Sequence, residues 1–288
     1  MIKTKISNYL SLVTFSHTIF AMPFAIIGYF LASSQTGQKF SWYLLLLVVL
    51  CMVFARNSAM AFNRFADRHF DSLNPRTALR EIPLGIIKPG SAMIFTMINS
   101  TLFIATTGFI NTITFRLSPV ALIIILGYSF TKRFTVFCHF VLGLGLSLAP
   151  IGAYLAVTGK FNWLPLMFSG IVLFWVTGFD IVYALQDDDF DKSYSLKSLP
   201  ALLGRKRAIL LSTLLHTFSA ILVIFAGIAI KSGEYYWIGA IIFILLLIYQ
   251  HLLIKPDKLN RINLAFATLN GIASVIFATF VLIDLIVK

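Results

Sequence analysis

Carboxylates recur at helical spacing in two stretches of this otherwise apolar chain. The first stretch is NRFADRHFDSLNPRT, in which Asn63, Asp67 and Asp71 are each four residues apart. Residues at i, i+4 and i+8 lie on one face of a helix, so the sequence predicts a polar ladder about 12 Å long. Like charges four residues apart destabilise a helix. Such a ladder therefore either is a solvated helix end with basic neighbours as partners or holds a cation.

The second stretch is DIVYALQDDDFDKSYSLKSLP, which begins at Asp180. Asp180, Asp187 and Asp191 fall at i, i+7 and i+11, which also predicts one helix face. Asp180 lies in an apolar run, where an ionisable side chain is costly and is a functional candidate. Lys192 and Lys197 follow directly, so cationic side chains stand beside the second ladder.

Two carboxylate ladders brought together repel each other unless a cation compensates them. Mg²⁺ takes oxygen ligands and usually binds through a few carboxylates plus substrate phosphates. With lysines and arginines nearby, the two ladders predict a magnesium–diphosphate site. A polyprenyl diphosphate fits such a site, because its head reaches the membrane surface and its tail lies among apolar helices. Its ionisation leaves an allylic cation that aromatic faces can stabilise. The site must exclude water so that an acceptor captures the cation.

The elements that carry these residues are predicted from long uncharged runs. Only 12% of the 288 residues are charged, whereas a soluble domain has about 25%. Asp, Glu, Lys and Arg are absent from 6–38, 40–55, 89–115, 117–131, 134–159, 161–179, 208–230, 235–254 and 262–283. A bilayer span needs about 20 apolar residues. The run 40–55 reaches that length if it continues past Arg56. The run 117–131 is the weakest span and comes closer to that length if it starts at Phe115. The sequence predicts an all-α integral membrane protein, with nine transmembrane helices around a central cavity and one domain over residues 1–288.

The basic residues predict the orientation. With nine spans, 17 of the 23 lysines and arginines flank one membrane face and five flank the other. Positive loops stay inside, so the N-terminus and both carboxylate clusters are predicted to be cytoplasmic, in the inner membrane of a bacterial cell. The net charge of +12 lies in loops beside the membrane. It therefore indicates contact with anionic membrane lipid and not with nucleic acid.

A transporter or cation channel is the alternative from another functional class, with the carboxylates as an ion path. Such a path needs polar sites near the midplane and broken helices. Both acidic clusters are predicted at one membrane face, which disfavours this alternative.

The two clusters also carry a resemblance. Asn63, Asp67 and Asp71 match N-x-x-x-D-x-x-x-D, and the residues from Asp180 to Asp191 match D-x-x-Y-A-x-x-D-x-x-x-D. With YSFTKRFT at 128–135 between them, the chain resembles the UbiA family of intramembrane prenyltransferases. The resemblance implies polyprenyl transfer from a diphosphate to a small aromatic acceptor in menaquinone or ubiquinone synthesis. Transfer to 4-hydroxybenzoate specifically, or to haem or a glycerol lipid, remains an alternative.

The resemblance also implies roles for individual residues and two Mg²⁺ ions bound with the diphosphate. Asn63, Asp67 and Asp71 would hold the first ion; Asp187 and Asp191 the second; Tyr128, Lys132 and Arg133 would grip the diphosphate or order the site; Tyr183 would lie near the allylic cation; and Asp180 would orient neighbouring groups. Arg56 precedes Asn63 by seven residues and shares its face, so it either reaches the same site or forms an internal ion pair. Asp188 and Asp189 are expected to face solvent.

The acceptor is where the sequence departs from the family pattern. Family members that use 4-hydroxybenzoate commonly carry an arginine early in the first span. Here LVTFSHTIFAMPFA has no Lys or Arg and only His17. FSHTIFAMPFA together with YALQD is more similar to the branch associated with menaquinone synthesis by the futalosine route. The sequence therefore predicts that 4-hydroxybenzoate is a poor substrate and that a larger aromatic precursor binds with hydrogen bonds involving His17. A structural role for His17 remains open.

Overall fold

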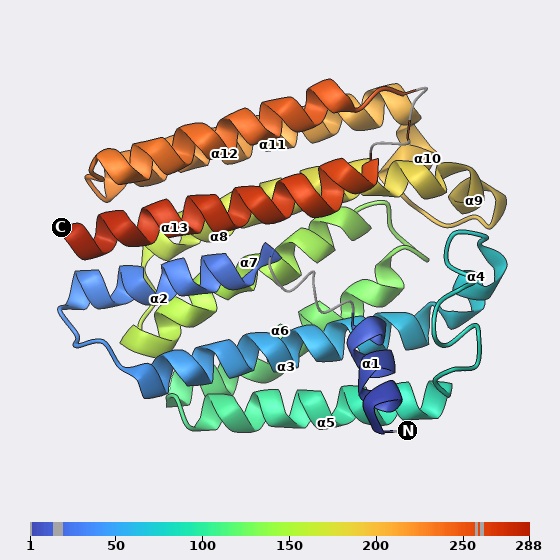
Figure 1. Ribbon diagram of the computed structural model, residues 1–288, viewed down its shortest axis with the longest axis horizontal. Coiled ribbons are helices and arrows are strands. Elements are labelled where there is room, and N and C mark those ends of the chain that lie inside the picture. The colour runs from blue at the N-terminus through green and yellow to red at the C-terminus, as the bar shows by residue number, and fades with distance from the viewer. Residues whose placement is uncertain (1, 14–19, 257–258, 260–261) are drawn as a thin grey trace.

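The computed structural model describes every residue except 1, 14–19, 257–258 and 260–261. The described residues form helices and turns (Figure 1). The helices are α1 (Ile2–Leu12), α2 (Met22–Thr36), α3 (Trp42–Ala66), α4 (Arg68–Leu73), α5 (Pro89–Gly108), α6 (Thr112–Thr131), α7 (Cys138–Thr158), α8 (Trp163–Ala184), the 3₁₀ turn η2 (Leu185–Asp187), α9 (Asp188–Ser193), α10 (Leu199–Leu203), α11 (Arg205–Ala229), α12 (Glu234–Leu253), the π-helix η3 (Leu264–Leu269) and α13 (Asn270–Val287).

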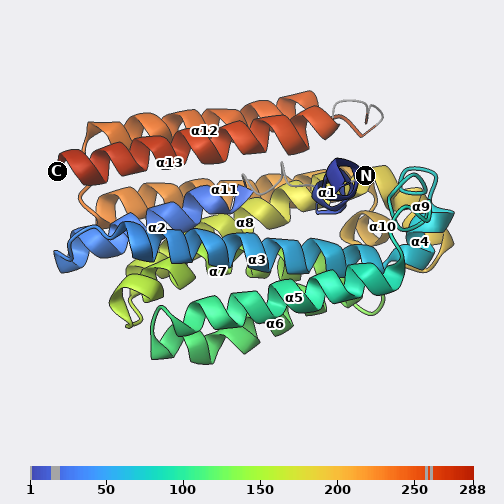
Figure 2. The ribbon, with the colours of Figure 1, turned by 60° about the horizontal axis from the view of Figure 1, so that its bottom comes forward.

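The long helices run side by side along the long axis of the molecule (Figures 1 and 2). Helix α7 packs against α2, α6 and α8, and α8 also packs against α11. Helix α3 lies on α5, and α12 lies on α13, which returns to α2. The short helices α4, α9 and α10 gather at one end of this bundle (Figure 1). The fold is therefore an all-helical bundle with its irregular segments concentrated at one end.

Eight of the described helices are long and apolar enough to cross a membrane. The helix at the position of the first predicted span, α2, has 15 residues, which is about 22 Å and shorter than the hydrocarbon core. Large apolar side chains are exposed on outer faces, including Ile123, Leu210, Phe225, Ile241 and Leu252. A water-soluble surface does not carry so much exposed apolar area. The bundle is thus built for lipid, and eight of the nine predicted spans are found among the described residues.

Polar side chains start the helices at the end opposite the carboxylates. The side chains of Ser41, Asn111 and Asn162 accept hydrogen bonds from backbone N–H groups in the first turns of α3, α6 and α8. Such caps satisfy N–H groups that have no partner within the helix. The weakest predicted span, 117–131, lies within one continuous helix of sufficient length, since α6 begins at Thr112 and includes Arg116.

An aromatic core holds four helices together. The rings of Phe24 from α2, Trp175 from α8, Phe243 from α12 and Phe277 from α13 are buried and lie 5.2–6.1 Å apart along their contacts. Beside it, Gly28 allows α2 to approach α7 closely, because a Cβ there would lie 2.1 Å from a backbone oxygen of α7. Burial of these rings fixes how α8 stands relative to its neighbours.

The structure corrects the prediction that each acidic ladder lies on one continuous helix. Helix α3 ends at Ala66, and Asp67 has φ −92° and ψ 4°, so Asp71 belongs to the separate helix α4. Likewise α8 ends at Ala184, and Asp191 belongs to α9 after the 3₁₀ turn. Each break changes the direction of the chain between two carboxylates. The second carboxylate of each pair is buried as a result.

Candidate active site

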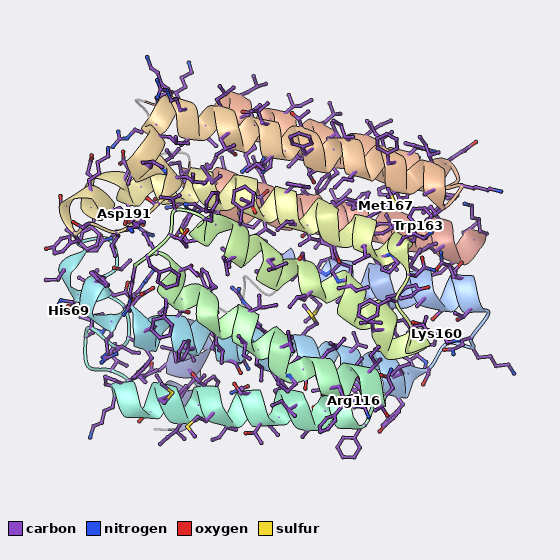
Figure 3. The ribbon with its side chains drawn as sticks, turned by 180° about the vertical axis from the view of Figure 1, so that it is seen from behind. His69, Arg116, Lys160, Trp163, Met167 and Asp191 are labelled. Atoms are coloured by element: carbon purple, nitrogen blue, oxygen red, sulfur yellow. The ribbon has the colours of Figure 1, made fainter. Side chains whose placement is uncertain are left out.

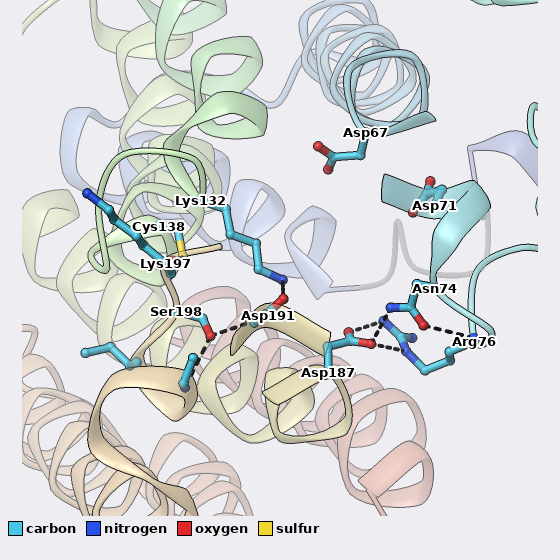
Figure 4. A network of polar contacts seen from close by, with 12 residues as sticks. Asp67, Asp71, Asn74, Arg76, Lys132, Cys138, Asp187, Asp191, Lys197 and Ser198 are labelled. Carbon is cyan, nitrogen blue, oxygen red and sulfur yellow. Dashed lines mark hydrogen bonds and ion pairs between the residues drawn. The ribbon is translucent and has the colours of Figure 1, made fainter. Parts of the chain in front are cut away.

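Four motif carboxylates lie at one end of the bundle, beside the two helix breaks. They are Asp67, Asp71, Asp187 and Asp191. Figure 3 shows Asp191 and His69 at this end, and Arg116, Lys160 and Trp163 at the other. In the close view of Figure 4, Asp67 and Asp71 stand opposite Asp187 and Asp191. The two sequence clusters, more than a hundred residues apart, are therefore brought to the same site as predicted.

Asp67 sits between an amide and a guanidinium. Asn63 Nδ2 donates to Asp67 Oδ2 at 3.0 Å, and Arg133 Nη2 lies 3.5 Å from Asp67 Oδ1. Arg133 also donates to the carbonyl of Ala66 at 2.5 Å, which closes the end of α3. Burial, and then the negative charge of Asp71, raise the pKa of Asp67 above its usual range despite Arg133.

Asp71 is buried at the end of the same motif. Arg80 Nη1 lies 2.6 Å from Asp71 Oδ1, and Thr77 Oγ1 donates to the Asp71 carbonyl at 3.1 Å. Asp71 Oδ2 is buried and accepts no hydrogen bond. A buried carboxylate oxygen without a donor is costly, which marks this atom as a candidate cation ligand.

Asp187 is held by the loop that follows the first motif. Asn74 Nδ2 donates to Asp187 Oδ1 at 2.9 Å, and Arg76 makes a bidentate ion pair with both carboxylate oxygens. Arg76 also donates to the Tyr183 hydroxyl at 2.9 Å, and its guanidinium lies over the Tyr183 ring. Burial alone lowers the pKa of Arg76, but the hydrogen bonds and charge of Asp187 outweigh it, so the net pKa is raised. The first loop and the second motif are thus joined directly.

Asp191 is fully buried and held from two sides. Lys132 Nζ lies 2.7 Å from Asp191 Oδ1, and Ser198 Oγ donates to Asp191 Oδ2 at 2.7 Å. Burial lowers the pKa of Lys132, and the charge of Asp191 more than restores it, giving a net increase. The Lys132 carbonyl also accepts from the Lys197 backbone N–H at 2.7 Å. Lys132 therefore ties the end of α6 to the second acidic cluster (Figure 4).

One basic side chain accompanies each of the four carboxylates: Arg133 with Asp67, Arg80 with Asp71, Arg76 with Asp187 and Lys132 with Asp191. The cations that compensate the two ladders in the described residues are therefore basic side chains. The described residues include no group of three acidic, His or Cys side chains that together could hold a metal ion. The donor set still suits a hard cation, because it offers carboxylate and amide oxygens and one buried oxygen without a partner.

Two predicted lysines lie elsewhere. Lys192 is 3.6 Å from Asp188, and Lys197 Nζ donates to the Phe134 carbonyl at 3.2 Å. Neither forms an ion pair with a motif carboxylate among the described residues. Lys192 lies within α9, four residues after its partner Asp188, and Lys197 follows the helix, with its side chain directed away from Asp191 (Figure 4).

Asp188 is also not where the sequence placed it. Its side chain is buried and accepts two hydrogen bonds from Arg205, at 2.8 and 2.9 Å. Asp189 is exposed, as predicted, with 82% of its side chain accessible, although it too contacts Arg205. Arg205 thereby fastens the first turn of α9 to the first turn of α11.

A second layer of polar residues lies deeper in the bundle. Arg56 precedes Asn63 by seven positions along α3, about 10 Å, and Asp180 of α8 precedes Asp187 by seven positions across the break after Ala184. Tyr128 of α6 is within electrostatic range of Arg56, Asp180 and Asp67. Asp180 pairs with His139 of α7 at 2.6 Å. The predicted residue His17 lies outside the described residues.

Arg56 also borders an apolar cavity of about 340 Å³ enclosed chiefly by α3, α5, α6 and α7. The cavity extends from Arg56 away from the carboxylates, toward residues such as Phe103 and Gly152. Arg56 Nε is buried without a hydrogen-bond partner. An internal ion pair, one of the two roles left open for Arg56, is not seen among the described residues. The Arg56 guanidinium therefore lies between the carboxylate site and the apolar cavity.

Sequence reasoning missed Arg76, Arg80 and Asn74 as partners of the carboxylates. Their signal was the segment NPRTALR, which places an amide and two guanidinium groups within a few residues of the first motif. His139 gave no local signal, because its partner Asp180 is 41 residues away, and Ser198, seven residues after its partner Asp191, lies outside the spacing of the motif.

Comparison with known proteins agrees with this geometry. Residues 21–273 match the UbiA prenyltransferase family. The chain belongs to this family. It is 32% identical over 242 residues, 82% of each chain, to 4-hydroxybenzoate octaprenyltransferase of Aliivibrio fischeri (strain MJ11). This UbiA-family chain is thus a multi-pass membrane prenyltransferase.

Solved structures of UbiA homologues share its fold. The apo structure of a UbiA homologue from Aeropyrum pernix K1 superposes with a TM-score of 0.84 at 31% identity, covering 93% of this chain and 98% of that one. A homologue from Archaeoglobus fulgidus bound to DMAPP and Mg²⁺ gives a TM-score of 0.77 at 22% identity, covering 98% and 100%. The predicted UbiA-like all-α fold is confirmed, while the count of nine spans stays a prediction.

Proposed function

We propose that residues 1–288 form one prenyltransferase domain that moves a polyprenyl chain from its diphosphate to an aromatic acceptor in quinone biosynthesis. One observation carries this proposal. Four carboxylates, each with its own basic partner, stand at one end of a membrane bundle, and an apolar cavity lies deeper in the same bundle. Such a site can bind a charged diphosphate head at the membrane surface and an apolar tail inside.

Magnesium is the proposed cofactor, as two ions bound with the diphosphate. Asn63, Asp67 and Asp71 would hold one ion, and Asp187 and Asp191 the other. The bound ions neutralise the leaving diphosphate. The described carboxylates are engaged with basic side chains, so Arg76, Arg80, Lys132 and Arg133 become available to the diphosphate when the carboxylates bind metal.

The side chains of the site then have separate tasks. Arg76, Lys132 and Arg133 bind the diphosphate oxygens, because a guanidinium or ammonium group makes short charge-assisted bonds to phosphate. Tyr183, held by Arg76, presents an aromatic face to the allylic cation. Tyr128 orders the layer between diphosphate and cavity. Lys192 and Lys197, which the sequence placed beside the second ladder, position their own loop through Asp188 and the Phe134 carbonyl.

Arg56 is proposed to bind the acceptor through a carboxylate. A buried carboxylate needs a cationic partner, and Arg56 offers a guanidinium whose Nε has none. The relative from Aliivibrio fischeri is named for 4-hydroxybenzoate, which carries such a carboxylate. A dihydroxynaphthoate carries one as well and matches the expectation of a larger ring bound near His17. Arg56 therefore favours an acceptor that is an aromatic carboxylate. The two candidate acceptors differ in the size of their ring system.

The test is an assay of purified protein with radioactive geranyl diphosphate and Mg²⁺, offering 4-hydroxybenzoate or a dihydroxynaphthoate. We expect prenylation of at least one, lost in Asp187→Asn and in EDTA. In Arg56→Gln the Michaelis constant for the acceptor should rise more than that for the diphosphate. Absence of transfer to either acceptor, with ion flux in liposomes instead, would support the transporter and overturn the proposal.

The carboxylate end is proposed to face the cytoplasm of a bacterial cell, with the protein in the inner membrane. The lysines and arginines around this end support the orientation. A membrane-impermeant thiol reagent should label Asp189→Cys in inside-out inner-membrane vesicles but not in intact spheroplasts. Labelling in spheroplasts alone would show that the carboxylate end faces the outside of the cell.

A further inference from the structure

We propose that Asp180, oriented by His139, is the base that takes the phenolic proton of the acceptor during transfer. This inference rests on the proposed function, because it requires a hydroxylated aromatic acceptor. It assigns a chemical step to two residues that contact none of the four proposed metal-binding carboxylates.

The hydrogen bonds around His139 fix its tautomer. His139 Nε2 accepts from the Leu199 backbone N–H at 3.4 Å, at the start of α10, so this nitrogen carries no proton. The other nitrogen, Nδ1, is then the protonated one and donates to Asp180 Oδ2 at 2.6 Å. His139 therefore donates through Nδ1, and Asp180 Oδ2 is held in a defined position.

The second oxygen of Asp180 is available. Asp180 Oδ1 accepts no hydrogen bond from the described residues, whereas Oδ2 is engaged by His139. The Asp180 side chain is 20% accessible, while that of His139 is 3% accessible. One oxygen of Asp180 is fixed by a buried imidazole, and the other can accept a proton. This is the arrangement of an oriented general base.

Its depth suits the acceptor and not the diphosphate. Asp180 lies within α8, before the break that precedes Asp187, and Arg56 lies about 10 Å before Asn63 along α3. Tyr128 is within electrostatic range of both Asp180 and Arg56, which places the two residues near one side chain. We place the acceptor ring between Arg56 on α3, which would bind its carboxylate, and Asp180 on α8, which would take the proton of its hydroxyl.

The proposed step balances as follows. The C–O bond of the allylic diphosphate breaks, and its electron pair leaves with the diphosphate. The acceptor ring forms the new C–C bond while its O–H proton passes to Asp180 Oδ1, giving a cyclohexadienone. Loss of the ring hydrogen as a proton to water, with return of the Asp180 proton to oxygen, restores the phenol. A base placed in this way contributes about 10²- to 10⁴-fold.

The experiment separates this step from ionisation of the diphosphate. The variant Asp180→Asn keeps shape and an oxygen for His139 but lacks the basic charge. At one pH near neutrality, with geranyl diphosphate and 4-hydroxybenzoate or a dihydroxynaphthoate, the kcat for transfer should fall about 10²-fold or more. Release of geraniol and diphosphate in the absence of acceptor should stay within about threefold of wild type, which also shows that the variant is folded.

A more acidic acceptor provides the rescue. With the corresponding ring-fluorinated acceptor, whose phenol is more ionised at the same pH, the deficit of Asp180→Asn should shrink at least tenfold relative to the parent acceptor. His139→Asn, which can still donate to Asp180, should retain more kcat than His139→Leu, with the Michaelis constant for acceptor nearly unchanged in both. A positional role alone does not predict dependence on the acidity of the phenol.

Three results would overturn the proposal. Full transfer by Asp180→Asn would assign the proton to the departing diphosphate. Equal loss of transfer and of geraniol release would place Asp180 in diphosphate ionisation. A deficit unchanged by fluorination would leave only a packing role. Failure of the wild-type protein to prenylate either acceptor would instead count against the proposed function itself.

Discussion

Lys132 Nζ lies 2.7 Å from Asp191 Oδ1, and Asp191 is fully buried. The two residues come from different halves of the chain, and Ser198 completes the shell of Asp191. An ion pair of this kind stabilises the site only while both members are present, because an isolated buried carboxylate is strongly unfavourable. Mutations of Lys132 and Asp191 can therefore change the stability of the protein independently of its prenyl-transfer activity.

Lys132→Met should destabilise the detergent-solubilised protein by up to about 3 kcal/mol, because it leaves Asp191 buried without a cation. The double variant Lys132→Met, Asp191→Asn should recover most of that loss, while prenyl transfer stays absent. Thermal unfolding and the transfer assay measure the two quantities. Equal stability of the single and double variants would show that the pair has no structural role.

Asp71→Asn and Asp191→Asn should each lower prenyl transfer by roughly a hundredfold or more, since each removes a charge that would neutralise the leaving diphosphate through bound metal. Asp189→Asn is the matched control, because Asp189 is exposed and belongs to the same acidic segment. Transfer is measured against Mg²⁺ concentration. Full activity of both site variants, or full activity in EDTA, contradicts the metal assignment.

Arg205→Gln should lower kcat several-fold and destabilise the protein by about 2 kcal/mol, because Asp188 loses charge-assisted hydrogen bonds that hold α9. Lys206→Gln, on the next residue of α11 and exposed, should change neither quantity. Unfolding and steady-state kinetics provide the readouts. If Lys206→Gln matched Arg205→Gln, the effect would come from surface charge and not from the contact with Asp188.

Gly152→Phe should restrict the length of prenyl chain that the enzyme accepts. Gly152 lines the apolar cavity, and a side chain there meets open space. The ratio of kcat/KM for a long to a short polyprenyl diphosphate should fall at least tenfold. Leu144→Phe, at an exposed position on the same helix, is the control. An unchanged ratio in Gly152→Phe would show that the tail lies elsewhere.

The sequence by itself determined the membrane class, the two acidic motifs and their placement at one end of the bundle. Runs of apolar residues and helical spacing are local properties, and the lipid environment permits few folds that satisfy them. The prediction that Asp67 and Asp71 lie at the same end of the bundle as Asp187 and Asp191 therefore agrees with the structure (Figure 4).

Only the tertiary structure decided how the charges are compensated. The helix breaks at Asp67 and after Ala184 turn Asp71 and Asp191 inward, and periodicity gives no warning of a break. The pairings of Arg76 with Asp187, Lys132 with Asp191 and His139 with Asp180 join residues 41 to 111 positions apart. Electrostatic energy depends on distance and burial, and both are set by how the helices pack and not by the order of residues along the chain.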